Sequence, residues 1–274
     1  MKLELAENYG FCFGVKRAIK IAEENKNSST YGSLIHNTKE IHRLQQDFNV
    51  SLKEDISEFK QGDKVVIRTH GIPKNELEFL KRSDIDVIDA TCPYVTKPQR
   101  ICEQMSKEGY DVVIYGDEAH PEIKGVKSYA QNGAYVVTSL DALKQLNLKE
   151  KIALVAQTTR KIEDYAQMAS YLIPKYKEVR VFNTICNATF ENQDAVRKLA
   201  KKVDIMIIIG GSNSSNTKQL FNIAREYCTD SYHIEDKDGL DPKWFTAKTH
   251  CGISAGASTP DWIIQNVIDS IQKL

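Results

Sequence analysis

Two kinds of segment alternate along the whole chain. Short runs rich in β-branched residues are typical of buried strands, and longer, more polar stretches separate them. The predicted strands are Thr30–Ile35, Lys64–Arg68, Asp86–Asp89, Asp111–Tyr115, Ala134–Val137, Lys151–Ala156, Glu178–Phe182, Asp204–Ile209 and Thr249–Ser254. The longest apolar run, Ile205 to Ile209, is far shorter than the roughly 20 residues of a membrane span, so no membrane-crossing helix is predicted.

Amphipathic helices are predicted between these strands. The spacing i, i+3, i+4, i+7 of one helix face is kept by Val196, Leu199, Ala200 and Val203, and again near the C-terminus by Ile264, Val267, Ile268 and Ile271. Strands that alternate with helices form βαβ units, whose parallel sheets are covered on both faces. The predicted fold class is therefore α/β with mainly parallel sheets.

A recurring cysteine divides the chain into three blocks. Cys12, Cys92 and Cys186 each follow an extended apolar segment and precede a helical one. The spacings, from 12 to 92 and from 92 to 186, are similar to the distance that remains to residue 274. We therefore predict three small α/β domains over residues 14–91, 92–185 and 186–274, the last one joined by an N-terminal strand within residues 1–13.

The charge balance argues against a polyanionic partner. Lys+Arg and Asp+Glu number 37 each, so the formal net charge is zero. Without an overall basic field, neither nucleic acid nor an anionic membrane is expected as a partner. The first residues, MKLELAENYG, lack the basic and apolar regions of an export signal, which predicts a cytoplasmic location.

The six cysteines do not form a local metal motif, because no two of them lie within four residues. Cys102, Cys228 and Cys251 are interpreted as buried thiols. The three cysteines at strand-to-helix junctions are expected at one centre, since ligands gather at the carboxyl ends of parallel strands. Thiolates select iron–sulfur clusters, zinc or copper(I). A structural zinc site usually has a fourth protein ligand, whereas a 4Fe-4S cluster held by three cysteines leaves one iron open for substrate.

Polar residues gather after other predicted strands. Three of them are histidines, His36, His70 and His120, which can bind metal, move protons or donate hydrogen bonds to an anion. Glu122 follows His120 closely and is a candidate proton donor. Its alternative role is that of an acidic residue in a first helical turn, an effect worth under about 1 kcal/mol.

Two loops of small residues favour an anionic ligand. Gly210–Thr217 (GGSNSSNT) lies between a predicted strand and a predicted helix, where hydroxyl and amide groups join unpaired backbone N–H groups. Ordinary N-capping explains one such residue but not five. The second loop, Ser254–Pro260, offers Ser258 as a donor. Neither loop fits a nucleotide-binding motif, so the anion is not expected to be a nucleotide.

Eight short motifs follow one another along nearly the whole chain: Asn8–Val15 (NYGFCFGV), Arg68–Ile72 (RTHGI), Asp89–Pro93 (DATCP), His120–Glu122 (HPE), Gln157–Thr159 (QTT), Asn183–Cys186 (NTIC), Asn213–Asn216 (NSSN) and Ala255–Pro260 (AGASTP). In this order and spacing they resemble the 4-hydroxy-3-methylbut-2-enyl diphosphate reductase family. The resemblance implies three α/β units arranged as a trefoil around a central 4Fe-4S cluster. It also implies the reductive dehydroxylation of that diphosphate to isopentenyl and dimethylallyl diphosphates, in the non-mevalonate isoprenoid pathway.

The resemblance also assigns roles to individual residues. It implies three cluster ligands, Cys12, Cys92 and Cys186, with one iron left open, and a set of diphosphate ligands: His36, His70, His120, Ser214, Asn216 and Ser258. Ser215 belongs to the same loop motif as Ser214. Glu122 and Thr158 are implied to bind the substrate hydroxyl, with Thr159 beside them. Glu122 is then the expected proton donor.

The sequence departs locally from the family pattern, at Phe13, at Asn187 and at Arg160–Lys161, without touching the implied ligands. Since no flavin or nicotinamide motif is present, electrons are expected from an external donor, a ferredoxin or flavodoxin. Two other functions stay open on the residues alone. One is a zinc-stabilised protein that binds a phosphorylated metabolite without redox catalysis, and the other is a cluster-bearing electron carrier, for which the histidines and the anion loop would be superfluous.

Overall fold

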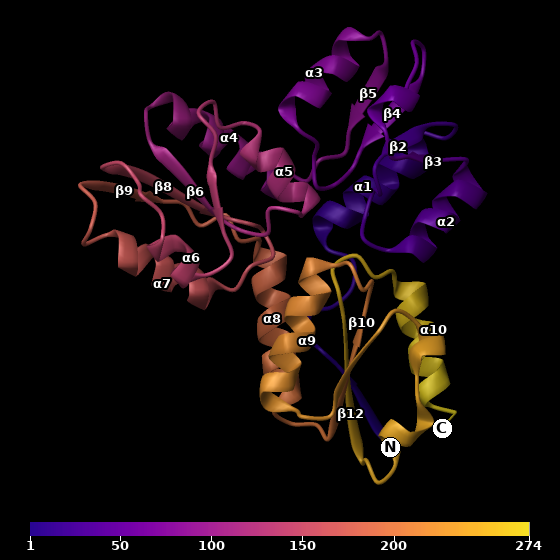
Figure 1. The fold of residues 1–274 in the computed structure, drawn as a ribbon. Coiled ribbons are helices and arrows are strands. Elements are labelled where there is room, and N and C mark those ends of the chain that lie inside the picture. Colours follow the sequence, from indigo (N-terminus) through magenta and orange to yellow (C-terminus); the bar gives the residue numbers. More distant parts are fainter. Residues whose placement is uncertain (274) are drawn as a thin grey trace. The chain divides into compact units, whose positions relative to one another are not determined.

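Three four-stranded parallel sheets form the framework of the protein, which confirms the predicted α/β class (Figure 1). The computed structural model describes residues 1–273. In order across each sheet, the strands are β3(Ser51–Lys53), β2(Ser29–Tyr31), β4(Lys64–Ile67) and β5(Asp86–Asp89); β7(Tyr135–Val137), β6(Asp111–Tyr115), β8(Lys151–Ala156) and β9(Glu178–Val181); and β1(Lys2–Leu5), β12(His250–Ala255), β10(Ile205–Ile209) and β11(Ser231–Ile234). Every pairing between these neighbours is parallel.

Helices make most of the connections between strands. They are α1(Phe13–Glu24), α2(Thr38–Phe48), α3(Lys74–Arg82), α4(Pro93–Lys107), α5(Pro121–Lys127), α6(Leu140–Lys144), α7(Ile162–Leu172), α8(Asn187–Ala200), α9(Ser215–Tyr227) and α10(Asp261–Ile271). Short 3-10 turns occur at Ile56–Glu58, Lys237–Gly239 and Pro242–Phe245. Within residues 1–273, no helix has the length and apolar character needed to cross a membrane.

The three sheets repeat one topology. In the first two, the chain forms an inner strand, one edge, the second inner strand and then the other edge. In the third sheet β10, β11 and β12 take the first three of these places, and β1 takes the fourth beside β12. The strands β1, β5 and β9 are therefore equivalent edges, and each leads toward one of the junction cysteines.

Packing divides the chain into two compact units. Unit 1 comprises Met1–Lys16, Ile35–His42 and Asn187–Leu274 and holds the third sheet. Unit 2 comprises Arg17–Leu34 and Arg43–Cys186 and holds the first and second sheets. The domain boundaries expected at 91/92 and 185/186 stay a prediction.

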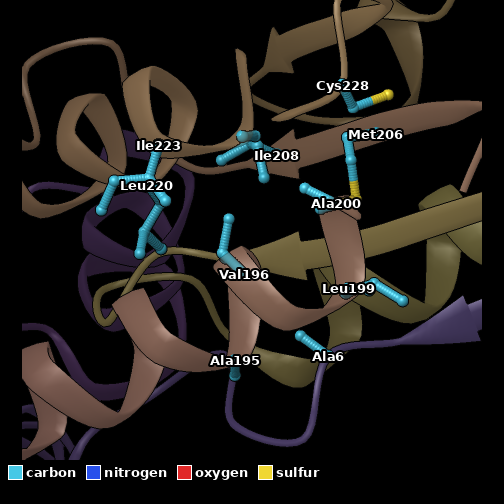
Figure 2. Close-up of a cluster of buried hydrophobic side chains, with 11 residues drawn as sticks. Ala6, Ala195, Val196, Leu199, Ala200, Met206, Ile208, Leu220, Ile223 and Cys228 are labelled. Carbon is cyan, nitrogen blue, oxygen red and sulfur yellow. The ribbon is translucent and has the colours of Figure 1, made fainter. Parts of the chain in front are cut away.

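The core of unit 1 lies on both faces of β10, whose residues are all buried. Met206 and Ile208 point to the face covered by α8 and α9, where they pack with Leu220 and Ile223 (Figure 2). Ile205, Ile207 and Ile209 alternate to the other face and pack with α10. A strand buried on both faces requires the continuous apolar run that the sequence shows.

Truncating this core should destabilise unit 1 strongly. Leu220→Ala removes a side chain with 0% exposure and should cost about 2–5 kcal/mol of unfolding free energy, because the cavity collapses only partly. Asn222→Ala, on the exposed side of the same helix, should stay within about 0.5 kcal/mol of the parent. Urea denaturation of both variants measures the difference, and equal stabilities would contradict the packing described.

The second sheet of unit 2 is likewise covered on both faces. One face packs against α6 and α7 through residues such as Leu143 and Met168. The other packs against α4 and α5, where Cys102, Ile123 and Val126 are buried. The helices α4 and α5 are thereby held on one face of this sheet, and each begins directly after a residue predicted for the site, Cys92 or His120.

Some predicted boundaries were wrong. The first predicted strand ends at Tyr31 instead of Ile35, because Gly32 takes a φ of +68°, which extended backbone does not allow. The helix predicted through Val203 ends at Ala200. The strands β3 and β11 were missed. Both are sheet edges that contain exposed or half-buried residues, so they lack the apolar run that marks a buried strand.

Candidate active site

The three junction cysteines all stand at the start of a helix. Cys92 is the N-cap of α4, while Cys12 and Cys186 directly precede α1 and α8. All three are partly exposed, whereas the other three cysteines are buried. This division into partly exposed and buried cysteines matches the one expected from the sequence.

The other cysteines have the character of core residues. Burial raises the pKa of Cys102 and that of Cys251 to about 12, and it also raises the pKa of Cys228. A thiol whose pKa is raised this way stays protonated at neutral pH and is a poor metal ligand. The burial of these three residues agrees with their interpretation as core thiols.

One backbone hydrogen bond recurs at each junction cysteine. The N–H groups of Cys12, Cys92 and Cys186 donate to the carbonyls of Ala257, Thr69 and Thr158 at 3.2, 3.0 and 3.0 Å. Each acceptor lies two residues beyond the end of the neighbouring inner strand, β12, β4 or β8. The next residues along the chain are Ser258, His70 and Thr159. The fold thus ties every junction cysteine to a loop that carries a residue of the predicted site.

A second set of equivalent positions follows the first inner strand of each sheet. His36, His120 and Ser214 each come five residues after the last residue of β2, β6 or β10. His120 and Ser214 are the N-caps of α5 and α9. The repeated topology, and not local sequence similarity, therefore places one histidine or hydroxyl at the same corner of each sheet.

In unit 1, a buried polar side chain in the first turn of α9 has no hydrogen-bond partner within the described chain. Ser214 Oγ accepts the N–H of Thr217 at 3.2 Å, which confirms the capping role and leaves its O–H proton to donate. Asn216 is 5% exposed, yet neither its Nδ2 nor its Oδ1 finds a hydrogen-bond partner among residues 1–273. Because buried amides are normally paired, this side chain indicates a missing polar ligand.

Two side chains that were not predicted from the sequence support the Gly210–Thr217 segment. The Glu235 carboxylate accepts the Ser212 N–H at 2.7 Å, a bond that lowers the pKa of Glu235. His233 Nε2 lies 2.8 Å from the Gly210 carbonyl. Both residues lie on or directly after β11, the edge strand that the apolar pattern did not reveal.

The second small-residue loop of unit 1 meets the segment that carries His36. Ser258 Oγ donates to the His36 carbonyl at 3.2 Å, and Gly211 approaches the same carbonyl so closely that an added Cβ would lie 2.5 Å from it. Ser258 is buried. Unit 1 therefore brings Ser258, His36 and the Gly210–Thr217 loop together, while Ser215 begins α9.

In unit 2, His70 and His120 lie next to each other. Their ring centroids are 5.4 Å apart in an edge-to-face arrangement. His120 Nδ1 accepts the Glu122 N–H at 3.1 Å, so this nitrogen carries no proton and the neutral ring bears its proton on Nε2. The Nε2–H of His120 is then a donor suited to an anionic oxygen.

Glu122 is held in a buried pocket of unit 2. Glu122 is 2% exposed. Thr158 donates hydrogen bonds to both of its carboxyl oxygens: the Thr158 N–H donates to Oε1 at 2.8 Å, and Thr158 Oγ1 donates to Oε2 at 2.7 Å. Burial raises the pKa of Glu122, and the Thr158 bonds and the Arg160 charge offset only part of that rise. The position supports a carboxyl that keeps its proton above the usual range.

This burial makes stability depend on pH. The folded pKa of Glu122 lies above the 4.5 of the unfolded side chain, so the folded state binds more protons between the two values. The contribution of protonated Glu122 to the free energy of unfolding is fully present below the unfolded pKa, and it is lost as pH rises through the folded pKa. Glu122→Gln should remove this dependence. Urea denaturation from about pH 4 to pH 8 should show the wild type losing stability relative to Glu122→Gln, and parallel pH profiles would contradict it.

The structure therefore gathers the predicted residues into two sets. Unit 1 carries Cys12, His36, Ser214, Ser215, Asn216 and Ser258, and unit 2 carries His70, Cys92, His120, Glu122, Thr158, Thr159 and Cys186. Unit 2 also contains a group absent from the predictions: Gln157 is fully buried, its Oε1 accepts the Asp117 N–H at 3.0 Å, and its Nε2 has no partner among residues 1–273. Gln157 precedes the threonine pair, so its motif was seen but its own role was not.

Comparison with known proteins gives consistent results. A family model described as LytB protein matches residues 3–272. The 4-hydroxy-3-methylbut-2-enyl diphosphate reductase of Sulfurimonas denitrificans is 72% identical over 100% of this chain and 99% of the relative, and that of Campylobacter concisus is 62% identical over 100% of both.

Two solved structures are also similar. One, described as (E)-4-hydroxy-3-methyl-but-2-enyl diphosphate reductase, the terminal enzyme of the non-mevalonate pathway, is 44% identical with a TM-score of 0.70 and full coverage of both chains. The other is the E-1-hydroxy-2-methyl-but-2-enyl-4-diphosphate reductase of Plasmodium falciparum. It is 27% identical, with a TM-score of 0.92 over 98% of this chain and 87% of that one.

Proposed function

The chain belongs to the LytB protein family of 4-hydroxy-3-methylbut-2-enyl diphosphate reductases, and we propose that the residues predicted for the site carry out the reductive reaction of that family. The observation that carries the proposal is the threefold pattern of accessible cysteines, each tied by its N–H to a loop that bears a predicted substrate ligand. The reaction removes the allylic hydroxyl of the substrate and yields isopentenyl and dimethylallyl diphosphates.

The donor set fits an iron–sulfur cluster. Cys12, Cys92 and Cys186 are the accessible thiols of the chain, and soft thiolate ligands suit iron–sulfur clusters. Three ligands instead of four leave one position for substrate. When bound, a 4Fe-4S cluster supplies electrons one at a time, which the side chains of this protein cannot do.

The remaining chemistry requires protons. Reduction of the C–O bond consumes two electrons and two protons: one proton leaves with the hydroxyl as water, and the other forms the new C–H bond. A carboxyl that donates must hold a proton at working pH, and burial raises the pKa of Glu122 in that direction. The Thr158 N–H fixes Oε1, so Oε2, which shares a hydrogen bond with the Thr158 hydroxyl, is the atom from which a proton can move.

The diphosphate end is assigned to donors that orient the substrate. His120 offers Nε2–H, Ser214 offers its hydroxyl proton, and the buried Asn216 offers an unpaired amide. His36, His70, Ser258, Ser215, Thr158 and Thr159 complete the proposed substrate site. Ser258 now donates to a backbone carbonyl, so it has to rotate before it can donate to a phosphate oxygen. Held by several donors, the substrate is restricted to one orientation.

Loss of an anion donor should weaken binding more than chemistry. Asn216→Ala should raise KM by about tenfold or more, because a charge-assisted hydrogen bond to phosphate is worth roughly 1.5–3 kcal/mol, while kcat changes little. Ser214→Ala should raise KM and also lower the stability of α9, since it removes the cap. Steady-state kinetics with the diphosphate measure both effects, and a drop in kcat at unchanged KM would remove these residues from the anion site.

The proposed function is tested with anaerobically purified protein. It should be brown, with broad visible absorption, and it should convert the substrate to both products when reduced methyl viologen supplies electrons. A colourless, zinc-loaded protein that binds the diphosphate without reducing it would contradict the proposal. In the cell an external ferredoxin or flavodoxin is the proposed donor, and the cytoplasm is the proposed location.

A further inference from the structure

A cleft in unit 2 opens directly beside one of the proposed cluster ligands. It has a volume of about 640 Å³ and is lined in part by Thr91 and Pro93, the two residues that flank Cys92. Because neighbouring Cα atoms are only about 3.8 Å apart, this wall of the cleft lies within one residue of the proposed cluster site. Phe182, which follows β9 on the way to Cys186, lines it as well.

The cleft is bordered by positive charge. Arg17, Lys97 and Arg100 line it, and Asp89 is the one carboxylate among its lining residues. Lys97 and Arg100 are exposed on α4 and form no ion pair within residues 1–273. Arg17 donates to the backbone carbonyls of Thr91 and Asp89 at 3.2 and 3.3 Å, so its charge is also not paired with a carboxylate.

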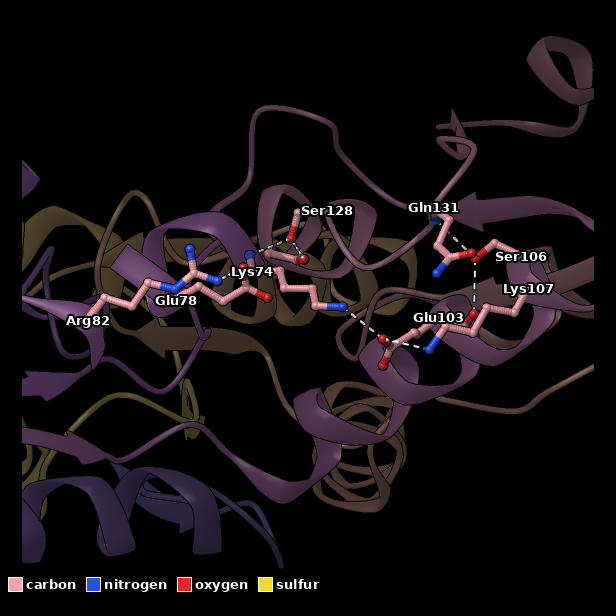
Figure 3. A network of polar contacts seen from close by, with 9 residues as sticks. Lys74, Glu78, Arg82, Glu103, Ser106, Lys107, Ser128 and Gln131 are labelled. Carbon is pink, nitrogen blue, oxygen red and sulfur yellow. Dashed lines mark hydrogen bonds and ion pairs between the residues drawn. The ribbon is translucent and has the colours of Figure 1, made fainter. Parts of the chain in front are cut away.

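The nearest acidic residue on the same helix does not neutralise this surface. Glu103, three residues after Arg100, pairs with Lys74 at 2.8 Å and Lys107 at 3.0 Å (Figure 3). Figure 3 also shows Arg82 beside Glu78, so other cations of unit 2 have acidic partners. Three cations and one carboxylate line the cleft, and none of the three cations forms an ion pair within residues 1–273, so the cleft is a local basic surface in a chain of zero net charge.

We propose that this basic cleft is the docking surface for the electron donor, an acidic protein that carries electrons one at a time. The proposal rests on the proposed function, since only a redox enzyme requires such a donor. Each turnover consumes two electrons, so two reduced carriers must dock in succession and leave oxidised.

The surface has the properties of a transient redox interface. Complementary charge speeds the encounter of two proteins without requiring a large buried area. Ile101 and Phe182 add apolar contact area between the basic residues. Docking here places the donor against the segment that carries Cys92, which keeps the electron path short, whereas a small metabolite would gain nothing from this proximity.

The test compares two reductants on the same holoenzyme. Lys97→Glu/Arg100→Glu should raise the KM for a photoreduced acidic 2Fe-2S ferredoxin by about tenfold or more at low ionic strength. Turnover driven by methyl viologen, a small cation that needs no docking surface, should stay within about twofold of wild type. Added salt should slow the ferredoxin reaction of the wild type and have a weaker effect on the variant.

The matched control is Lys60→Glu/Lys81→Glu, which makes the same change of charge at exposed lysines of unit 2 away from the cleft. It should leave the ferredoxin KM unchanged, and visible absorption confirms that each variant holds its cluster. An unchanged ferredoxin KM in the cleft variant would overturn the proposal. So would a rise confined to the KM for the diphosphate, which would assign the cleft to a small anion. Failure of the wild type to turn over with methyl viologen would instead count against the proposed function.

Discussion

Cys92→Ser should leave the protein without its cluster and without measurable turnover, and Cys12→Ser and Cys186→Ser should do the same. Serine places a hard hydroxyl where a soft thiolate is needed, so each change removes one of three ligands from a site that has none to spare. Iron analysis and visible absorption of anaerobically purified protein measure the loss of the cluster, and the viologen assay measures the loss of turnover.

The matched control for these variants is Cys228→Ser. The Cys228 thiol lies 3.7 Å from the carbonyls of Val203 and Asp230, so a serine hydroxyl finds acceptors in the same place and the core is disturbed little. This variant should keep its iron and its activity. Iron lost from Cys228→Ser but retained in Cys92→Ser would show that the ligands had been assigned to the wrong cysteines.

Glu122→Gln should reduce turnover by about 10²–10⁴ while the substrate still binds. The amide keeps the shape of the carboxyl, and it keeps both contacts with Thr158, whose N–H still donates to an oxygen and whose hydroxyl can accept from the amide NH₂. Only the transferable proton is lost. Single-turnover kinetics of pre-reduced enzyme, with iron content matched to wild type, separate this step from binding.

The other possible role of Glu122 predicts a different result. If Glu122 interacts only with the helix dipole of α5, it contributes under about 1 kcal/mol to stability and nothing to the rate of turnover. Asp141→Asn removes an exposed acidic residue from the first turn of another helix, α6, and should leave turnover intact. A Glu122→Gln rate within about threefold of wild type would exclude the proton-donor role.

Most of the fold could be predicted because buried parallel strands are read from local sequence. The runs that became β6, β8 and β10 are continuous and apolar, since both faces of those strands are covered. The edges β3 and β11 carry exposed and half-buried residues, so their sequences lack that run. One helix end was also predicted wrongly, because the helix predicted through Val203 stops at Ala200.

The candidate residues of the site came from the sequence, but their environments did not. The sequence does not show which cysteines are accessible: Cys92 is partly exposed and Cys102 is buried, and only the packing of the fold makes that difference. Glu235 and the unpaired side chain of Gln157 could not be inferred, because their importance depends on which backbone groups lie opposite them.

The sequence by itself determined the α/β class, the recurring cysteine at three strand-to-helix junctions and the motifs of the family, because periodicity, spacing and residue chemistry are local properties. Only the tertiary structure decided that Glu122 meets Thr158, that each junction cysteine donates its N–H to the loop after the neighbouring strand, and that unpaired cations border a cleft at Cys92. These facts depend on strand order and helix packing, which bring together residues far apart along the chain and set how much water reaches them.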